Sequence, residues 1–195
     1  MDQNHLMIDA YGDYVEDYIR QGWEGYFLSF MFNQLRGNKD GLLRQMEREV
    51  ERVYATLLTR VVRDPTHPKN KDLLPRWIIS PDLPVPKRAK LSLSDVTLND
   101  GYHLQGTGLH HPLSRLKTPL DQHFQDYQDL YVKAGGALRS VTATPITHTP
   151  KRVVGYGFKA IPRRSATFDD LLILPRALSE VKDRRRETGA PDRVV

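Results

Sequence analysis

Residues 22–64, GWEGYFLSFMFNQLRGNKDGLLRQMEREVERVYATLLTRVVRD, decide the fold that we expect. The segment 26–32 is rich in aromatic residues and bounded by glycine, which predicts a buried strand followed by a turn. From residue 39 to residue 64, apolar residues recur at helical spacing with charged residues between them. This pattern predicts a long amphipathic helix that Pro65 ends.

The rest of the chain predicts further elements on both sides of this stretch. A short leading helix is expected within residues 9–22, where aromatic and aliphatic residues share one helical face. Residues 64–92 contain many prolines and lysines, which predicts a long exposed loop with a strand at 77–79. The remaining expected elements are strands at 102–109 and 137–147 and helices at 116–132 and 151–159.

This element order, β-α-β-β-α-β-α, predicts an α+β fold: a split β-α-β-β-α-β sandwich, in which an antiparallel sheet has helices on one face. The 195 residues suit one domain with a substantial core. We expect a helical lead-in at 1–22, the main domain at 23–175, and a helical to disordered basic tail at 176–195. The absence of a glycine-rich P-loop motif excludes nucleotide hydrolysis of that kind.

Composition limits where the protein works and what it contacts. Cysteine is absent, so the chain has neither a disulfide nor a thiolate metal site, as is usual in a reducing cytoplasm. The chain contains no long apolar run and its acidic start lacks the features of a secretory signal. We therefore expect a cytoplasmic protein with no membrane partner. The formal net charge of +5 favours polyanionic partners.

The stretch 100–106, DGYHLQG, contains the first candidate for chemistry. On a strand, residues i and i+2 point to the same face, so His103 and Gln105 would present an imidazole nitrogen and an amide oxygen together. Such a pair suits Mg²⁺ or Mn²⁺, whereas the alternative is an ordinary solvated strand face. His123 and Gln125 have the same spacing in a predicted helix, where the two side chains diverge, so we expect no metal there.

Residues 154–159, VGYGFK, contain the second candidate. In a helix, Tyr156 and Lys159 are i and i+3 neighbours, which brings a phenol and an ammonium group to one face. A phenol is a weak nucleophile at neutral pH unless nearby positive charge favours the phenolate, and Lys159 would supply that charge or hold a phosphate. The alternative is a half-buried tyrosine beside a solvated lysine.

Taken together, these motifs resemble those of the HUH endonucleases, the initiators of rolling-circle replication in plasmids and phages. HLQG at 103–106 resembles the metal-binding motif in the His-apolar-Gln form of circovirus-type initiators. Tyr156 and Lys159 resemble the Y-x-x-K nucleophile motif, and the aromatic strand at 26–32 stands where the family has its first motif. The family fold is the split sandwich that the element order predicts.

The resemblance implies an endonuclease that nicks single-stranded DNA at a replication origin. Tyr156 would attack the scissile phosphate and form a 5′-phosphotyrosine while a 3′-hydroxyl is released, with Lys159 assisting. Single-stranded DNA or an origin hairpin would be the partner, and a host helicase a further partner. Gln105 departs from the commoner second histidine, and the glycines beside Tyr156 are unfavourable in a helix.

The resemblance also implies Mg²⁺ or Mn²⁺ bound by His103 and Gln105, with Asp82 or Asp100 as the third ligand. Basic residues bracket both motifs and are candidates for contacts with the DNA backbone: Arg115, Lys117, Lys151, Arg152, Arg163 and Arg164. Two other functions stay open. The protein could bind nucleic acid on the same fold without cleaving it, or be a partner-binding domain whose basic tail serves only solubility.

Overall fold

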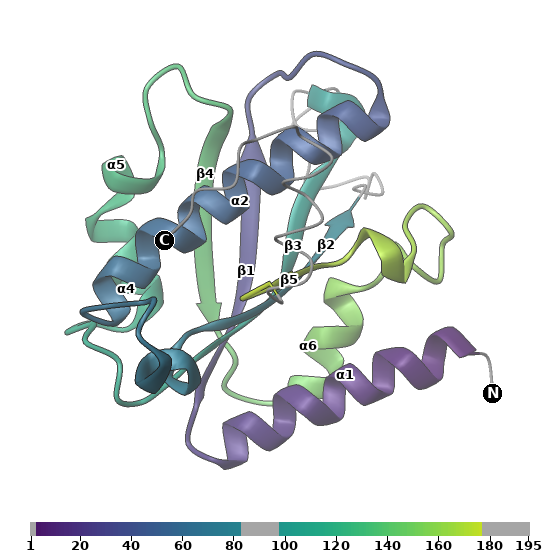
Figure 1. Ribbon diagram of the computed structural model, residues 1–195. Helices are drawn as coiled ribbons and strands as arrows, with labels where there is room; N and C mark the ends of the chain where they lie inside the picture. Colours follow the sequence, from purple (N-terminus) through teal and green to yellow (C-terminus); the bar gives the residue numbers. More distant parts are fainter. Residues whose placement is uncertain (1–2, 83–97, 177–195) are drawn as a thin grey trace.

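The computed structural model describes residues 3–82 and 98–176, which form an α+β fold around an open antiparallel sheet (Figure 1). Its strands are β1 (Glu24–Phe32), β2 (Arg76–Asp82), β3 (His103–His110), β4 (Leu138–Pro145) and β5 (Leu172–Leu174). Its α-helices are α1 (Gln3–Arg20), α2 (Lys39–Val61), α4 (Leu120–Asp126), α5 (Gln128–Tyr131) and α6 (Pro150–Gly157). Short 3₁₀ helices are η1 (Pro68–Leu73), η2 (Leu98–Gly101) and η3 (Phe168–Asp170). None of the described helices is both long and apolar enough to cross a membrane.

The sheet has the strand order β4-β1-β3-β2-β5. β1, α2 and β2 form a split β-α-β unit, because β3 lies between β1 and β2 and pairs antiparallel with both. β4 pairs with the free edge of β1, and β5 pairs with the free edge of β2. The predicted α+β class and antiparallel sheet are confirmed.

Helices cover both faces of this sheet. α2, α4 and α5 pack on one face over a core that includes Phe30 and Trp77, whereas α1 and α6 pack on the other with Val15 and Phe158. Side chains alternate along each strand, so β3 contributes Leu104 to the first core and Leu109 to the second. The prediction that the helices share one face therefore holds for α2, α4 and α5. Helices α1 and α6 were predicted as helices, but they pack on the opposite face.

Several element boundaries differ from those predicted. The leading helix begins at Gln3, and the chain turns at Tyr127 (φ −119°, ψ 31°), which divides the helix expected at 116–132 into α4 and α5. The strand expected at 77–79 is wrong in length and setting, since β2 is a buried seven-residue strand. β5 was not predicted. Residues 83–97, which include the end of the loop predicted at 64–92, and residues 177–195 of the predicted tail lie outside the described residues.

The two glycines of α6 meet different surroundings. Gly157 is buried, and a Cβ there would lie 3.6 Å from Cα of Gly106 and 3.7 Å from the Phe27 ring. At Gly155, a Cβ would have one neighbour within 4 Å, Ile8 Cγ2 at 3.9 Å. Gly155→Ala should therefore raise the free energy of unfolding by about 0.5–1 kcal/mol, because alanine favours the helix and restricts the unfolded chain. Urea denaturation measures this change, and a loss of stability would contradict the packing described for α6.

A buried histidine makes the stability depend on pH. His110, at the end of β3, is 3% exposed, and its Nε2 atom has no hydrogen-bond partner in residues 3–82 and 98–176. Burial, helped by the nearby charges of His123 and His111, lowers the pKa of His110 from 6.5 to about 4. Between these two values the unfolded chain binds a proton that the folded protein does not bind. The contribution of His110 to stability should therefore fall by about 3 kcal/mol as the pH falls from 6.5 to 4.

Urea denaturation at several pH values tests this prediction, with His110→Leu as the variant that cannot titrate. The wild type should lose more stability than His110→Leu on acidification, by the amount given above. Parallel losses in the two proteins would show that His110 is protonated as readily in the folded state as in the unfolded chain.

Candidate active site

Tyr156 and Lys159 lie together at the end of α6. The Tyr156 side chain is 53% exposed, and Lys159 Nζ lies 3.3 Å from its hydroxyl oxygen and 4.3 Å from its ring centroid. Tyr156 belongs to the last turn of α6, and Lys159 to the turn that follows. The predicted i and i+3 proximity of the phenol and the ammonium group is confirmed.

Lys159 connects Tyr156 to a buried carboxylate. Asp82 ends β2 and is paired directly with His103, the first residue of β3. Its Oδ2 atom lies 2.7 Å from Lys159 Nζ and 3.3 Å from His103 Nε2, and the Asp82 side chain is only 1% exposed. Strands β2 and β3 and the turn after α6 therefore bring one carboxylate, one imidazole and one ammonium group into contact beside the Tyr156 hydroxyl.

The charge on Asp82 is favoured by these neighbours. Burial raises the pKa of Asp82, but the contacts with His103 and Lys159 lower it by more, so that it lies below its ordinary value. Asp82 is therefore ionised at neutral pH. An ionised carboxylate is an oxygen ligand of the kind that Mg²⁺ takes in proteins, and here it is also the partner of the Lys159 ammonium group.

Gln105 lies on the same face of β3 as His103 but is covered by the end of α6. Its side chain is 3% exposed, and its Nε2 atom donates to the backbone oxygens of Tyr156 and Gly157, both at 3.4 Å. Gln105 thus joins the middle of the sheet to the turn that carries Tyr156. A solvated strand face, the alternative for this pair, is wrong at Gln105.

His123 and Gln125 have the same spacing as His103 and Gln105, and their side chains diverge as expected. His123 is buried, with Nε2 2.7 Å from the Tyr131 hydroxyl, whereas Gln125 is exposed on α4. The two side chains diverge because they lie on a helix, and they form no common site.

Asp82, His103 and Gln105 are the residues that could hold a divalent cation. The described part of the chain has no cluster of three or more His, Cys, Asp or Glu side chains suited to a metal ion, so the third ligand of this set must be the amide of Gln105. Asp82 Oδ1 supports the fit, because it is buried without a hydrogen-bond partner in the described residues while Lys159 occupies Oδ2. The side chain of Asp100, the other third-ligand candidate, lies outside the described part.

A groove of about 400 Å³ borders Tyr156 and contains no acidic side chain among the described residues that line it. Phe27 lines it, with a ring centroid 5.6 Å from that of Tyr156, and Arg152 supplies a positive charge. The other lining residues are Thr144, Pro145, Ile146, His148, Thr149 and Val153. Aromatic rings beside a cation suit a nucleic-acid base and its phosphate, and sequence reasoning did not find this groove.

The structure brings some of the predicted basic residues to this site and leaves others away from it. Arg152 lines the groove, and Arg163 and Arg164 are exposed in the turns that follow Lys159. Lys151 forms ion pairs with Asp13 and Glu16 of α1, so its charge is already neutralised. Arg115 and Lys117 follow the far end of β3, which carries the chain about 24 Å away from His103.

The chain matches no family model, no curated protein and no solved structure.

Proposed function

We propose that this protein is a metal-dependent endonuclease of the HUH type, which nicks single-stranded DNA and initiates replication through a covalent tyrosine intermediate. The observation that carries the proposal is the contact of Lys159 Nζ with both the exposed Tyr156 hydroxyl and the buried Asp82 carboxylate, next to His103. Phosphodiester transfer requires a nucleophile, positive charge beside it and ligands for a cation. In support of the proposal, an exposed phenol, an ammonium group and side chains that could hold a cation lie close together here, beside the groove that borders Tyr156.

In the proposed step, the Tyr156 hydroxyl oxygen attacks the scissile phosphorus and the bond from phosphorus to the 3′ oxygen breaks. The phenolic proton leaves Tyr156, and the 3′ oxygen is protonated to a hydroxyl, so the step is balanced. Lys159 stabilises negative charge that develops on the attacking oxygen, and its ion pair with Asp82 fixes the position of the ammonium group. A divalent cation held by Asp82, His103 and Gln105 would supply Lewis acidity at a phosphate oxygen.

The test is the formation of a covalent protein–DNA adduct. The full chain is incubated with Mn²⁺ and single-stranded oligonucleotides of mixed sequence that carry a fluorophore at the 3′ end. Cleavage with a 5′-phosphotyrosine transfers the labelled part of the strand to the protein, giving a fluorescent protein band that survives denaturation. Binding of the strands without a labelled band at any Mn²⁺ concentration would contradict cleavage and leave binding alone.

A second candidate function, binding of single-stranded DNA without cleavage, is favoured by a different observation. Lys159 already neutralises Asp82, and the amide nitrogen of Gln105 is already bonded to α6. If these contacts persist, the charge of Asp82 is already neutralised and a metal cation is not required to stabilise the site. Whether the protein binds Mn²⁺ therefore separates the two candidates.

If the metal set is correct, His103→Ala should weaken Mn²⁺ binding at least tenfold, because one of three protein ligands is removed. Electron paramagnetic resonance of free Mn²⁺ measures this without any need for activity. The matched control is His67→Ala, since His67 is exposed and its Nδ1 atom accepts a hydrogen bond from the nearby Lys69 backbone N–H. Equal binding by both variants would exclude His103 as a ligand.

A further inference from the structure

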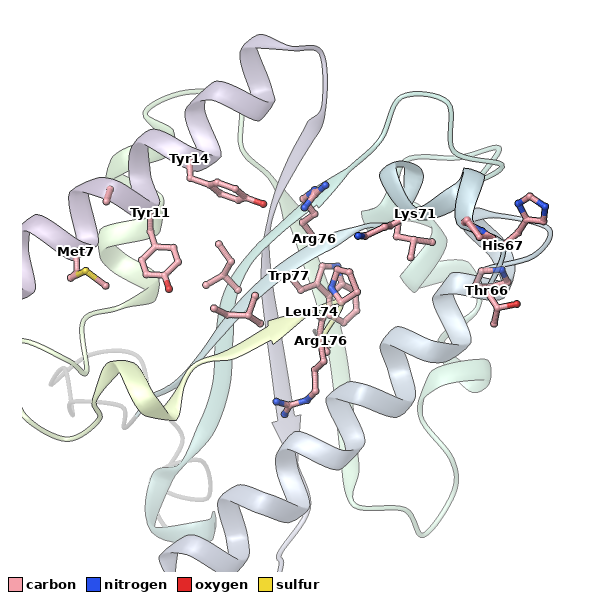
Figure 2. Close-up of a pocket in the computed structure, with 17 residues that line it drawn as sticks. Met7, Tyr11, Tyr14, Thr66, His67, Lys71, Arg76, Trp77, Leu174 and Arg176 are labelled. Atoms are coloured by element: carbon pink, nitrogen blue, oxygen red, sulfur yellow. The ribbon is translucent and has the colours of Figure 1, made fainter. Parts of the chain in front are cut away.

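A second and larger cavity, of about 960 Å³, lies toward the other end of β2, between α1, the segment 65–74, β2 and the chain around β5 (Figure 2). We call it the Arg76 pocket. Its lining residues include Tyr11, Tyr14, Lys71, Trp77 and Arg76. Arg76 precedes Asp82 by six positions in one strand, roughly 20 Å. The Arg76 pocket is therefore separate from the Tyr156 site.

Two cations of this pocket, Arg76 and Lys71, differ from Arg176, which also lines it and is paired with Glu51. None of the described residues that line it is Asp or Glu, and neither Arg76 nor Lys71 forms an ion pair within residues 3–82 and 98–176. Figure 2 shows the Tyr14 hydroxyl and the Lys71 amine directed toward the Arg76 side chain. An unpaired guanidinium group and a nearby ammonium group at one cavity favour an anionic ligand.

Arg76 is held in place by aromatic rings. Its guanidinium carbon lies 5.0 Å from the ring centroid of Tyr18 and 5.7 Å from that of Trp23, while its buried Nε atom has no hydrogen-bond partner in the described part of the chain. Stacking of this kind positions the guanidinium group without consuming its N–H donors. These donors match a phosphate, which accepts two of them side by side.

The remaining walls suit a flat, apolar body. Tyr11 and Tyr14 present aromatic rings from α1, and Ile173 and Leu174 present aliphatic side chains from β5. The volume is at the upper end of the range of about 300–1,000 Å³ found for small-molecule sites, which are mostly apolar with a few placed polar groups. The ligand that fits is an anion with a planar ring system.

We propose that the Arg76 pocket binds a nucleotide, with its phosphate on Arg76 and Lys71 and its base against the tyrosine rings of α1. The phosphate needs the two unpaired cations, and the base needs the aromatic wall. A free mononucleotide and a nucleotide within a single strand share this chemistry. The proposal does not depend on cleavage by Tyr156.

Tryptophan fluorescence reports on this pocket directly. The chain has two tryptophans: Trp77 lines the pocket, and Trp23 stacks against Arg76. The full chain is titrated with deoxyadenosine monophosphate and, separately, with a short single strand of deoxyadenylate. We expect saturable quenching, with deoxyadenosine and inorganic phosphate each binding at least tenfold more weakly, because each offers only half of the recognised groups. Quenching by the mononucleotide would show that the pocket binds a free nucleotide. Quenching by the strand alone would show that it binds a nucleotide within single-stranded DNA.

Variants with matched controls complete the test. Lys71→Ala should weaken binding about tenfold, because one charge-assisted hydrogen bond is lost. Lys69→Ala, on the same 3₁₀ helix but away from the pocket, should bind as the wild type does. Tyr156→Phe should also leave quenching unchanged, so the failure of one proposal is distinguishable from that of the other. The proposal is overturned if neither nucleotide quenches, if Lys69→Ala and Lys71→Ala behave alike, or if phosphate or an oligoglutamate peptide binds as tightly as the nucleotide.

Discussion

Tyr156→Phe protein should form no covalent adduct with single-stranded DNA, while it binds the same strand and unfolds at the same temperature as the wild type. The substitution removes the attacking oxygen and keeps the ring, whose centroid lies 5.6 Å from that of Phe27. Among the residues that the structure describes, the lost hydroxyl is bonded only to the Lys159 ammonium group, and more than half of the side chain is exposed, so the folded state loses little. Denaturing gels measure the adduct, and thermal unfolding measures the stability.

Tyr127→Phe is the matched control for this experiment. Tyr127 is 54% exposed, close to the 53% of Tyr156, but it lies between α4 and α5 on the other face of the sheet. It should form the adduct as the wild type does. An adduct that persists in Tyr156→Phe would place the nucleophile elsewhere, and an adduct lost from both variants would point to a general effect of removing a surface hydroxyl.

Gly106→Ala should lower the free energy of unfolding by about 3 kcal/mol or more, because the new methyl group meets the backbone of the neighbouring strand. A Cβ at Gly106 would lie 2.0 Å from the Ile78 backbone oxygen and 2.8 Å from Ile79 Cα. Strand β2 would have to move away from β3, and these strands carry Asp82 and His103. Urea denaturation measures the loss.

Gly108→Ala tests whether the backbone is the reason. Gly108 lies on the same strand, and its Cβ would first meet Leu28 Cδ1 at 2.7 Å, the end of a flexible side chain. Its loss of stability should be smaller than that of Gly106→Ala, and Gly155→Ala should change stability in the opposite direction. Equal losses at Gly106 and Gly108 would contradict the close approach of β2 to β3.

Local patterns predicted the parts of this molecule that depend on local geometry. The helix that became α2 follows from apolar residues at helical spacing, and the contact between Tyr156 and Lys159 follows from three residues of separation. β2 was underestimated because prolines at positions 75 and 81 disguise a buried strand. β5 has three residues, too few to show any period.

Features that depend on distant segments could not be predicted in the same way. Asp82 was one of two candidates for the third ligand, because its position opposite His103 comes from the register of β2 with β3. Arg115 and Lys117 are close to the metal motif in sequence, but an extended strand separates them from it. Lys151 is close in sequence to the nucleophile motif, but its ammonium group is paired with Asp13 of α1. Asp13 lies more than a hundred residues earlier in the sequence.

The contacts between α1 and α6 change what must be regarded as the smallest working unit of this protein. Lys151 is paired with Asp13, the Tyr11 ring lies 5.3 Å from that of Phe158, and Val15 is fully buried in the core cluster that also contains Val154. A chain shortened to residues 23–175 would keep every strand and every residue named in the site, but it would remove the support on which the helix of Tyr156 rests. The N-terminal helix α1 and the helix of Tyr156 therefore form one packed unit. A domain boundary placed before β1 would divide this unit.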